Sequence, residues 1–179
     1  MSRVVVFLGP SLPIAAARRL LAADYRGPAR CGDVLRAVLD EAAVIGLIDG
    51  YFHDAPAVWH KEILYALERG VAVLGAASMG ALRAAELASF GMVGVGRIAA
   101  AFRSGCLTDD DEVAVRHGPA ALGYPLLSEP LVNIRATVAR AVRQGALPGS
   151  SARSLLEIAK RTFYPERSWE RLLDRADGL

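Results

Sequence analysis

Ser78 is the residue of this chain whose type and position most clearly suit chemistry. It lies in a turn of small residues between an apolar run at 71–74, which predicts a buried strand, and an alanine-rich stretch at about 79–89, which predicts a helix. A hydroxyl at the start of a helix lies beside unpaired backbone N–H groups and the positive end of the helix dipole. Those surroundings favour a bound anion or a developing oxyanion, so Ser78 is a candidate catalytic nucleophile.

The turn resembles the G-x-S-x-G nucleophile elbow, with Ala76 in place of the first glycine. The competing interpretation is an ordinary N-cap, because serines that cap helices are far commoner than catalytic ones. Gly75 and Gly80 also have the spacing of a P-loop, but Ala81 and Leu82 stand where Lys and Ser or Thr are required. A nucleotide hydrolase is therefore excluded. No G-x-G-x-x-G follows a predicted strand, which argues against a dinucleotide enzyme.

Three residues are candidates for moving or orienting a proton. His60 lies in the first turns of a predicted helix, and His117 precedes a Gly-Pro turn, so either histidine suits a general base. Asp49 follows the apolar run 44–48, where a carboxylate could orient a base or bind an amine, although a turn cap is the alternative. Further groups near the same turns could hold an anion, through backbone N–H groups, a hydroxyl or a cationic side chain: Gly9, Ser11, Met79, Gly80, Lys61 and Arg83.

Metal and disulfide chemistry are not indicated. Residues 109–112 are four consecutive acids, which cannot all point at one ion, so a solvated loop or a contact with a basic partner explains them better. Cys31 and Cys106 belong to no C-x-x-C pair, which argues against a zinc site and a disulfide framework. We expect a cytoplasmic protein that uses no metal and no cofactor.

The composition places the chain among ordinary globular domains. The net charge is +2, but residues 135–179 hold nine Lys and Arg against five Asp and Glu. This basic end could attract an acidic partner, although a solvated helical face is the simpler interpretation. Aromatic residues are not interleaved with these cations, so no nucleic-acid partner is expected. No apolar run approaches the roughly 18 to 20 residues that a membrane span requires, so no membrane partner is expected either.

The elements that must position these residues follow from the hydrophobic pattern. Three apolar runs, at 4–8, 44–48 and 71–74, end in Gly or Asp-Gly and predict buried parallel strands. A short strand is expected at 29–31. Helices are expected at 13–23, 34–43, 56–69 and 79–89. This alternation predicts an α/β fold, a three-layer sandwich with a mainly parallel, Rossmann-like sheet. The turns that follow its strands should share one crevice at the carboxyl edge of the sheet.

The pattern changes beyond residue 90, where glycines interrupt a short helical stretch. Residues 130–144 regain a helical period, and a further helix starts either at a capping box formed by Ser154 and Glu157 or at Ser150 or Ser151. We expect a single domain over 1–179, with an α/β core at about 1–128 and a helical C-terminal extension at about 129–179.

Several short motifs taken together resemble the TfuA-like proteins. The longest is the Ser-Met-Gly-Ala-Leu-Arg block within residues 75–87. The others are Gly9–Leu12, Gly32-Asp33, Asp49–Phe52, His60–Ile63, Gly91–Gly96, Asp110–Ala114 and Asn133–Arg135. The likeness covers roughly the first three-quarters of the chain, and the region after about 145 carries no motif of the family.

The resemblance implies a partner of YcaO enzymes in the biosynthesis of ribosomal peptides with thioamide bonds. In that chemistry a YcaO protein activates a backbone amide with ATP, and a sulfur nucleophile replaces the carbonyl oxygen. TfuA-like proteins are thought to supply the sulfur, by releasing sulfide from a thiocarboxylated ThiS-like carrier or by recruiting a donor. The resemblance therefore leaves two hypotheses, a thiocarboxylate hydrolase and a non-catalytic adaptor. The adaptor would dock the YcaO protein, the precursor peptide or the sulfur carrier.

Overall fold

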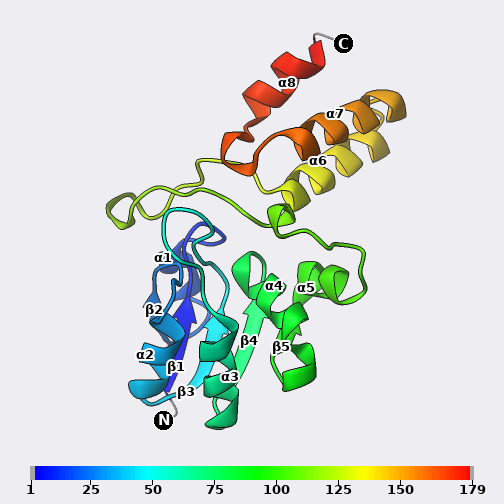
Figure 1. Cartoon of the computed structure of the whole chain (residues 1–179). Helices are drawn as coiled ribbons and strands as arrows, with labels where there is room; N and C mark the ends of the chain where they lie inside the picture. The colour runs from blue at the N-terminus through cyan, green and yellow to red at the C-terminus, as the bar shows by residue number, and fades with distance from the viewer. Residues whose placement is uncertain (1–2, 178–179) are drawn as a thin grey trace. The chain divides into compact units, whose positions relative to one another are not determined.

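The computed structural model describes residues 3–177 and contains one five-stranded sheet in which every pairing is parallel. The strand order is β2-β1-β3-β4-β5, formed by β1 (Arg3–Phe7), β2 (Asp24–Arg26), β3 (Ala42–Leu47), β4 (Ala72–Ala76) and β5 (Val93–Val95). Figure 1 shows these strands coloured from blue to green in chain order. The predicted α/β class and parallel sheet are confirmed. The order places a topological switch point between β1 and β3, where ligands bind in such sheets.

The two edge strands lie where the apolar pattern gives no signal. The short strand expected at 29–31 forms instead at Asp24–Arg26, and Ala29 contributes only an isolated bridge to Gly50. Ion pairs hold β2, because Asp24 contacts Arg3 and Arg26, and Arg26 also contacts Asp40 (2.8–3.1 Å). An edge strand made of charged residues resists pairing with other chains, and it has no apolar run to reveal it.

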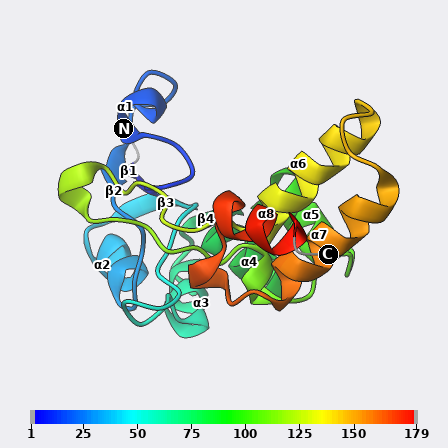
Figure 2. The same ribbon diagram turned by 90° about the horizontal axis from the view of Figure 1, so that it is seen from above.

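Helices lie on both faces of the sheet, but unequally (Figure 2). α2 (Asp33–Leu39), α3 (His60–Glu68) and α4 (Met79–Glu86) pack on the face that carries Ile45 and Val73, where the largest core cluster forms. α5 (Gly96–Arg103) lies on that side too, since a Cβ at Gly94 would meet side chains of α4 and α5. The opposite face, with Val4 and Val6, carries α1 (Ile14–Ala17).

α1 is much shorter than the helix expected at 13–23. Its buried residue is Ala17, whereas Leu20 is 82% exposed, so further turns would bury little apolar surface. The helix expected at 79–89 ends at Glu86 and is followed by the 3₁₀ turn η1 (Ala88–Phe90).

The chain forms two compact units. The first contains the residues up to Thr108 together with Gly118–Pro125, and the second contains Asp109–His117 and the residues from Leu126 onward. The expected single domain, with its boundary near 128, remains a prediction. Short 3₁₀ turns occur in both units: η2 (Asp110–Glu112), η3 (Ala120–Leu122) and η4 (Tyr164–Glu166).

The second unit is helical. It consists mainly of α6 (Leu131–Arg143), α7 (Gly149–Arg161) and α8 (Trp169–Asp177), which share a core around Ile134, Leu155 and Leu172. α6 matches the predicted helix 130–144. α7 begins before Ser150, so Ser154 lies inside the helix rather than at its cap.

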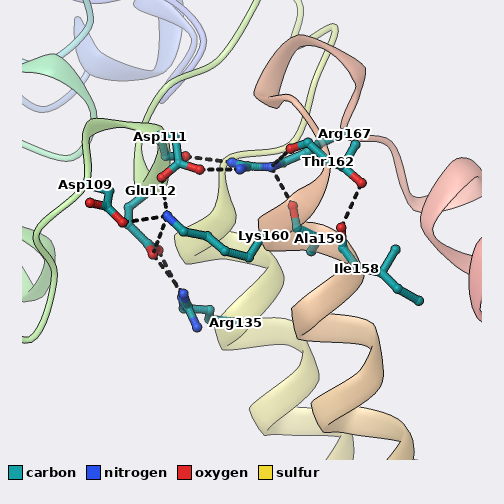
Figure 3. A network of polar contacts seen from close by, with 9 residues as sticks. All are labelled: Asp109, Asp111, Glu112, Arg135, Ile158, Ala159, Lys160, Thr162 and Arg167. Carbon is teal, nitrogen blue, oxygen red and sulfur yellow. Dashed lines mark hydrogen bonds and ion pairs between the residues drawn. The ribbon is translucent and has the colours of Figure 1, made fainter.

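The acidic run 109–112 belongs to an ion-pair network in this second unit (Figure 3). Lys160 Nζ donates to carboxylate oxygens of Asp109 and Asp111 (2.7 and 2.6 Å), and Arg135 binds Glu112 through two hydrogen bonds. The Arg167 side chain is 1% exposed, contacts the Asp111 carboxylate, and donates to the main-chain carbonyls of Asp111, Ala159 and Thr162. The acids therefore hold the loop onto α6 and α7. No group of three metal-binding side chains occurs within residues 3–177.

This network predicts a pH-dependent stability of the second unit. Burial raises the pKa of the Asp111 carboxyl, but hydrogen bonds from Lys160 and Arg167 outweigh it and hold the pKa below its ordinary 3.8. A lowered carboxylate pKa stabilises the fold above about pH 4, and that stability is lost as the pH falls through the lower native value. We expect urea unfolding monitored by Trp169 fluorescence, in a Trp59→Phe background, to show a stability that weakens below pH 4.

The matched control for this prediction is another acid of the same run. Asp111→Asn should reduce the acid dependence, whereas Asp110→Asn, at an exposed neighbouring position, should retain it. An unchanged pH profile in Asp111→Asn would contradict the assignment.

Within residues 3–177, no helix combines the length and apolar character that crossing a membrane requires.

Candidate functional site

The turns after β1 and β3 meet at the carboxyl edge of the sheet, where Asp49 joins them. The Asp49 side chain is buried, and its Oδ2 accepts hydrogen bonds from the backbone N–H groups of Gly9 (2.8 Å) and Ser11 (3.0 Å). The Ser11 hydroxyl donates to Oδ1 at 2.6 Å. Asp49, Gly9 and Ser11 are thus brought together, but as a clamp in which the carboxylate holds the loop after β1.

This clamp predicts a stability defect for Asp49→Asn. The amide would present an NH₂ group to donors that now face a carboxylate oxygen, and buried hydrogen bonds to a charged group contribute about 1.5–3 kcal/mol each. We expect the free energy of unfolding to fall by about 2 kcal/mol in urea titrations. Asp54→Asn, in the exposed loop after β3, serves as the matched control and should be neutral. Equal midpoints for the two variants would contradict the clamp.

The turn that carries Ser78 packs directly against the end of β3. The Gly80 N–H donates to the Ile48 carbonyl (3.1 Å), and a Cβ at Gly80 would lie 1.7 Å from the Leu47 carbonyl oxygen. A Cβ at Gly50 would lie 2.8 Å from Met79 Cγ. The turns after β3 and β4 therefore touch through their backbones, as the parallel sheet predicted. The Gly80 N–H, one of the predicted anion donors, is already used by Ile48.

The backbone of this turn adopts an unusual conformation at the residue before the serine. Ala77 has a φ of +57°, in the left-handed region that residues with a Cβ rarely occupy. Ser78 follows as the N-cap of α4, but its side chain makes no capping hydrogen bond, and the residue is buried at 8% exposure. Strain of this kind gathers at functional sites. A capping hydrogen bond, the usual reason for a serine at an N-cap, therefore does not explain Ser78.

His60 lies in a polar cluster away from Ser78. Its Nε2 is 2.8 Å from Glu86 Oε2, and the same oxygen accepts a hydrogen bond from Arg83 Nη1 (2.6 Å). Arg83 Nε also donates to the Val58 carbonyl. Glu86 ends α4 and Ser78 precedes it, so this cluster is roughly 12 Å farther along the helix axis. The structure joins His60 to Arg83 through Glu86, a residue that the sequence analysis did not select.

Glu62, the neighbour of Lys61, proves to be structural. Its buried carboxylate accepts hydrogen bonds from the N–H groups of Gly32, Val34 and Leu35 at the start of α2, and from that of Trp59 (2.8–3.3 Å). A carboxylate in this place caps the helix and complements its dipole. Glu62 therefore fixes α3 against α2. Lys61 is exposed on α3.

His117 belongs to the second unit, where it pairs with Leu126 in an isolated antiparallel bridge and is 9% exposed. It is therefore not among the side chains that the first unit brings together. Cys31 is half-buried in the first unit, Cys106 is exposed, and neither forms a disulfide.

Comparison with known proteins adds one match. The model of the family described as TfuA-like protein matches residues 49–168, which include the turn that closes β3, the Ser78 turn and the acidic run. No curated protein matches the chain.

Proposed function

The chain belongs to the TfuA-like family, whose general role is associated with YcaO thioamidation, and we propose that it releases sulfide from a thiocarboxylated ThiS-like carrier protein for that reaction. The observation that carries this proposal is the Ser78 turn. It combines a strained backbone, an N-cap serine whose side chain makes no capping hydrogen bond, and a position at the carboxyl edge of a parallel sheet.

The proposed reaction begins with attack on the thiocarboxylate carbon. The Ser78 hydroxyl, or a water that it positions, forms a C–O bond, and the negative charge moves to the carbonyl oxygen. Because Gly80 is engaged by Ile48, we assign the stabilising N–H of the first turn of α4 to Met79. The sulfur takes up the proton of the attacking hydroxyl or water, the C–S bond breaks, and the electron pair leaves with sulfur as hydrosulfide. If Ser78 itself attacks, a water hydrolyses the ester, so the net products are carboxylate, hydrosulfide and a proton.

His60 and His117 are the two proposed proton acceptors. Because His60 pairs with Glu86, roughly 12 Å along α4 from Ser78, it would receive the proton through bridging waters rather than directly. Lys61 and Arg83 are the cations that would offset the charge of the thiocarboxylate, although Arg83 is also held by Glu86. The pairing of His60 with Glu86 favours the second candidate function, a non-catalytic adaptor, because it holds one of the two predicted bases away from Ser78. The adaptor would dock the YcaO protein, the precursor peptide or the carrier.

One experiment separates the two functions. The purified protein is mixed with a thiocarboxylated ThiS-like carrier in the absence of YcaO, and released sulfide is measured. Catalytic sulfide release supports the hydrolase. Sulfide at the uncatalysed rate, together with binding of the carrier, supports the adaptor.

A further inference from the structure

A pocket of about 260 Å³ lies beyond the ends of β1 and β2 in the first unit. Its lining includes Pro28, Arg30, Tyr51 and Tyr124. None of these residues takes part in the Ser78 turn or in the Asp49 clamp. The pocket lies at the carboxyl edge of the sheet, where ligands of open parallel sheets bind.

Tyr124 reaches this pocket on a separate segment, Gly118–Pro125, and is held there at a conformational cost. Its φ is +58°, which is exceptional for a bulky residue, and Gly123 before it is also left-handed. The Gly118 N–H donates to the Pro125 carbonyl (2.8 Å) and closes the segment into a loop. A Cβ at Gly27 would lie 2.0 Å from the Tyr124 hydroxyl oxygen, so the glycine makes room for the phenol. The backbone at Tyr124 is therefore strained in the conformation that places its ring against the pocket.

The charges around the pocket are paired to different extents. Arg26 is bound by Asp24 and Asp40 at 3.0 Å or less. The Asp33 carboxylate accepts from the backbone N–H of Arg30 (3.0 Å) and from Arg36 (3.2 Å). The Arg30 guanidinium is 4.0 Å from Asp33, and its side chain is 62% exposed. Arg30 is therefore the lining cation best able to exchange its present contact for a ligand.

The Tyr124 hydroxyl provides a donor near this cation. Burial raises the pKa of the Tyr124 phenol, the neighbouring Tyr51 raises it further, and Arg30 opposes both. The phenol therefore keeps its proton at neutral pH and can donate to an anion. A guanidinium beside a neutral phenol suits a carboxylate better than a cation or an apolar group.

We propose that this pocket binds the C-terminal carboxylate of an extended glycine-rich peptide tail, with Arg30 as the cation and Tyr51 and Tyr124 as walls. The volume corresponds to about nine waters at ~30 Å³ each, which is enough room for the end of a peptide. The flat walls of Pro28 and the two tyrosines favour a chain without bulky side chains. The identification of this tail as that of a sulfur carrier rests on the proposed function, and the end bound here is then the carboxylate product, not the thiocarboxylate that Ser78 attacks.

The test is a direct binding measurement by calorimetry with three probes: a tetrapeptide ending in Gly-Gly with a free carboxylate, its C-terminal amide, and inorganic phosphate. We expect the free acid to bind at least about tenfold more tightly than the amide, because the amide cannot form the charge-assisted pair. Phosphate should bind at least about tenfold more weakly than the acid, since it leaves the apolar walls unfilled. Equal affinities for acid and amide, equal affinity for phosphate, or no binding of the acid would overturn the proposal.

Variants locate the site. Arg30→Gln should lose about tenfold in affinity for the free-acid peptide. Gly27→Ala should lose as much, because its Cβ would displace Tyr124. Arg97→Gln removes an exposed arginine of the same unit and should bind as wild type. Tyr124→Phe keeps the ring and should show a smaller loss. Thermal unfolding of each variant verifies folding, and wild-type affinity in folded Arg30→Gln would overturn the assignment. Because calorimetry measures binding, a failure of sulfide release would not contradict the Arg30 pocket. Likewise, a failure of the peptide to bind would not contradict the Ser78 assay.

Discussion

Ser78→Ala is expected to reduce sulfide release from a thiocarboxylated carrier by at least about a hundredfold, the size of effect seen when one group acting on a transition state is lost. The variant should remain folded. A lost N-cap costs only about 1 kcal/mol, which a domain stable by about 5–15 kcal/mol tolerates, and Ser78 makes no capping hydrogen bond to α4. The measurement is sulfide released by purified protein without YcaO, with circular dichroism and thermal unfolding as checks of the fold.

Two further variants make this result specific. Ser89→Ala removes an exposed hydroxyl from η1 in the same unit and should release sulfide at the wild-type rate. Ser78→Cys supplies another nucleophile and should retain part of the activity if the side chain attacks directly. A folded Ser78→Ala protein that works at the wild-type rate would remove the nucleophile assignment. Activity absent from wild type as well would favour the adaptor.

Gly80→Ala is expected to destabilise the first unit by at least about 3 kcal/mol, the upper end of the usual cost of overpacking. The new Cβ would lie 1.7 Å from the Leu47 carbonyl oxygen, which is backbone and cannot rotate away. Relieving this clash requires α4 to move from β3, which also breaks the Gly80–Ile48 hydrogen bond. Domains are stable by only about 5–15 kcal/mol, so much of the protein should unfold at low urea concentrations.

Gly149→Ala provides the matched control. Gly149 opens α7, and a Cβ there would meet nothing within 4 Å, so alanine should be neutral or stabilise the helix by up to about 1 kcal/mol. The comparison uses urea unfolding monitored by circular dichroism. Wild-type stability in Gly80→Ala would show that α4 does not begin against the backbone of β3.

The central strands were predictable because each is a continuous apolar run, although only the face that carries Ile45 and Val73 is fully buried, while Val44 and Leu74 on the other face are partly exposed. β1, β3 and β4 lie at the predicted positions, and the turns after them meet at one edge, as parallel strands require. β2 was not predictable in the same way, since ion pairs of Asp24 and Arg26 hold it. α1 was overestimated because a helical period does not reveal whether a partner surface exists for Leu20.

The candidate site likewise has a part that was predictable from the sequence and a part that was not. Local sequence identified Ser78 and the strand-to-helix turn, because small residues between an apolar run and a helical pattern are typical of a tight turn of this kind. The partners of each polar side chain depend on distant segments. Asp49 clamps the loop of Ser11, 38 residues earlier, and His60 contacts Glu86, 26 residues later. Sequence spacing carries no information about such contacts.

The sequence by itself determined the fold class, the TfuA-like relationship and the place of the serine turn, since all three depend on short-range patterns of apolar and small residues. Only the tertiary structure decided that Glu62 caps α2, that the acidic run pairs with Lys160 and Arg167, and that Tyr124 lines a pocket beside Arg30. The physical reason is that a hydrogen bond or ion pair acts within a few ångströms. The residues that lie within that range are set by how the chain packs, not by their order along it.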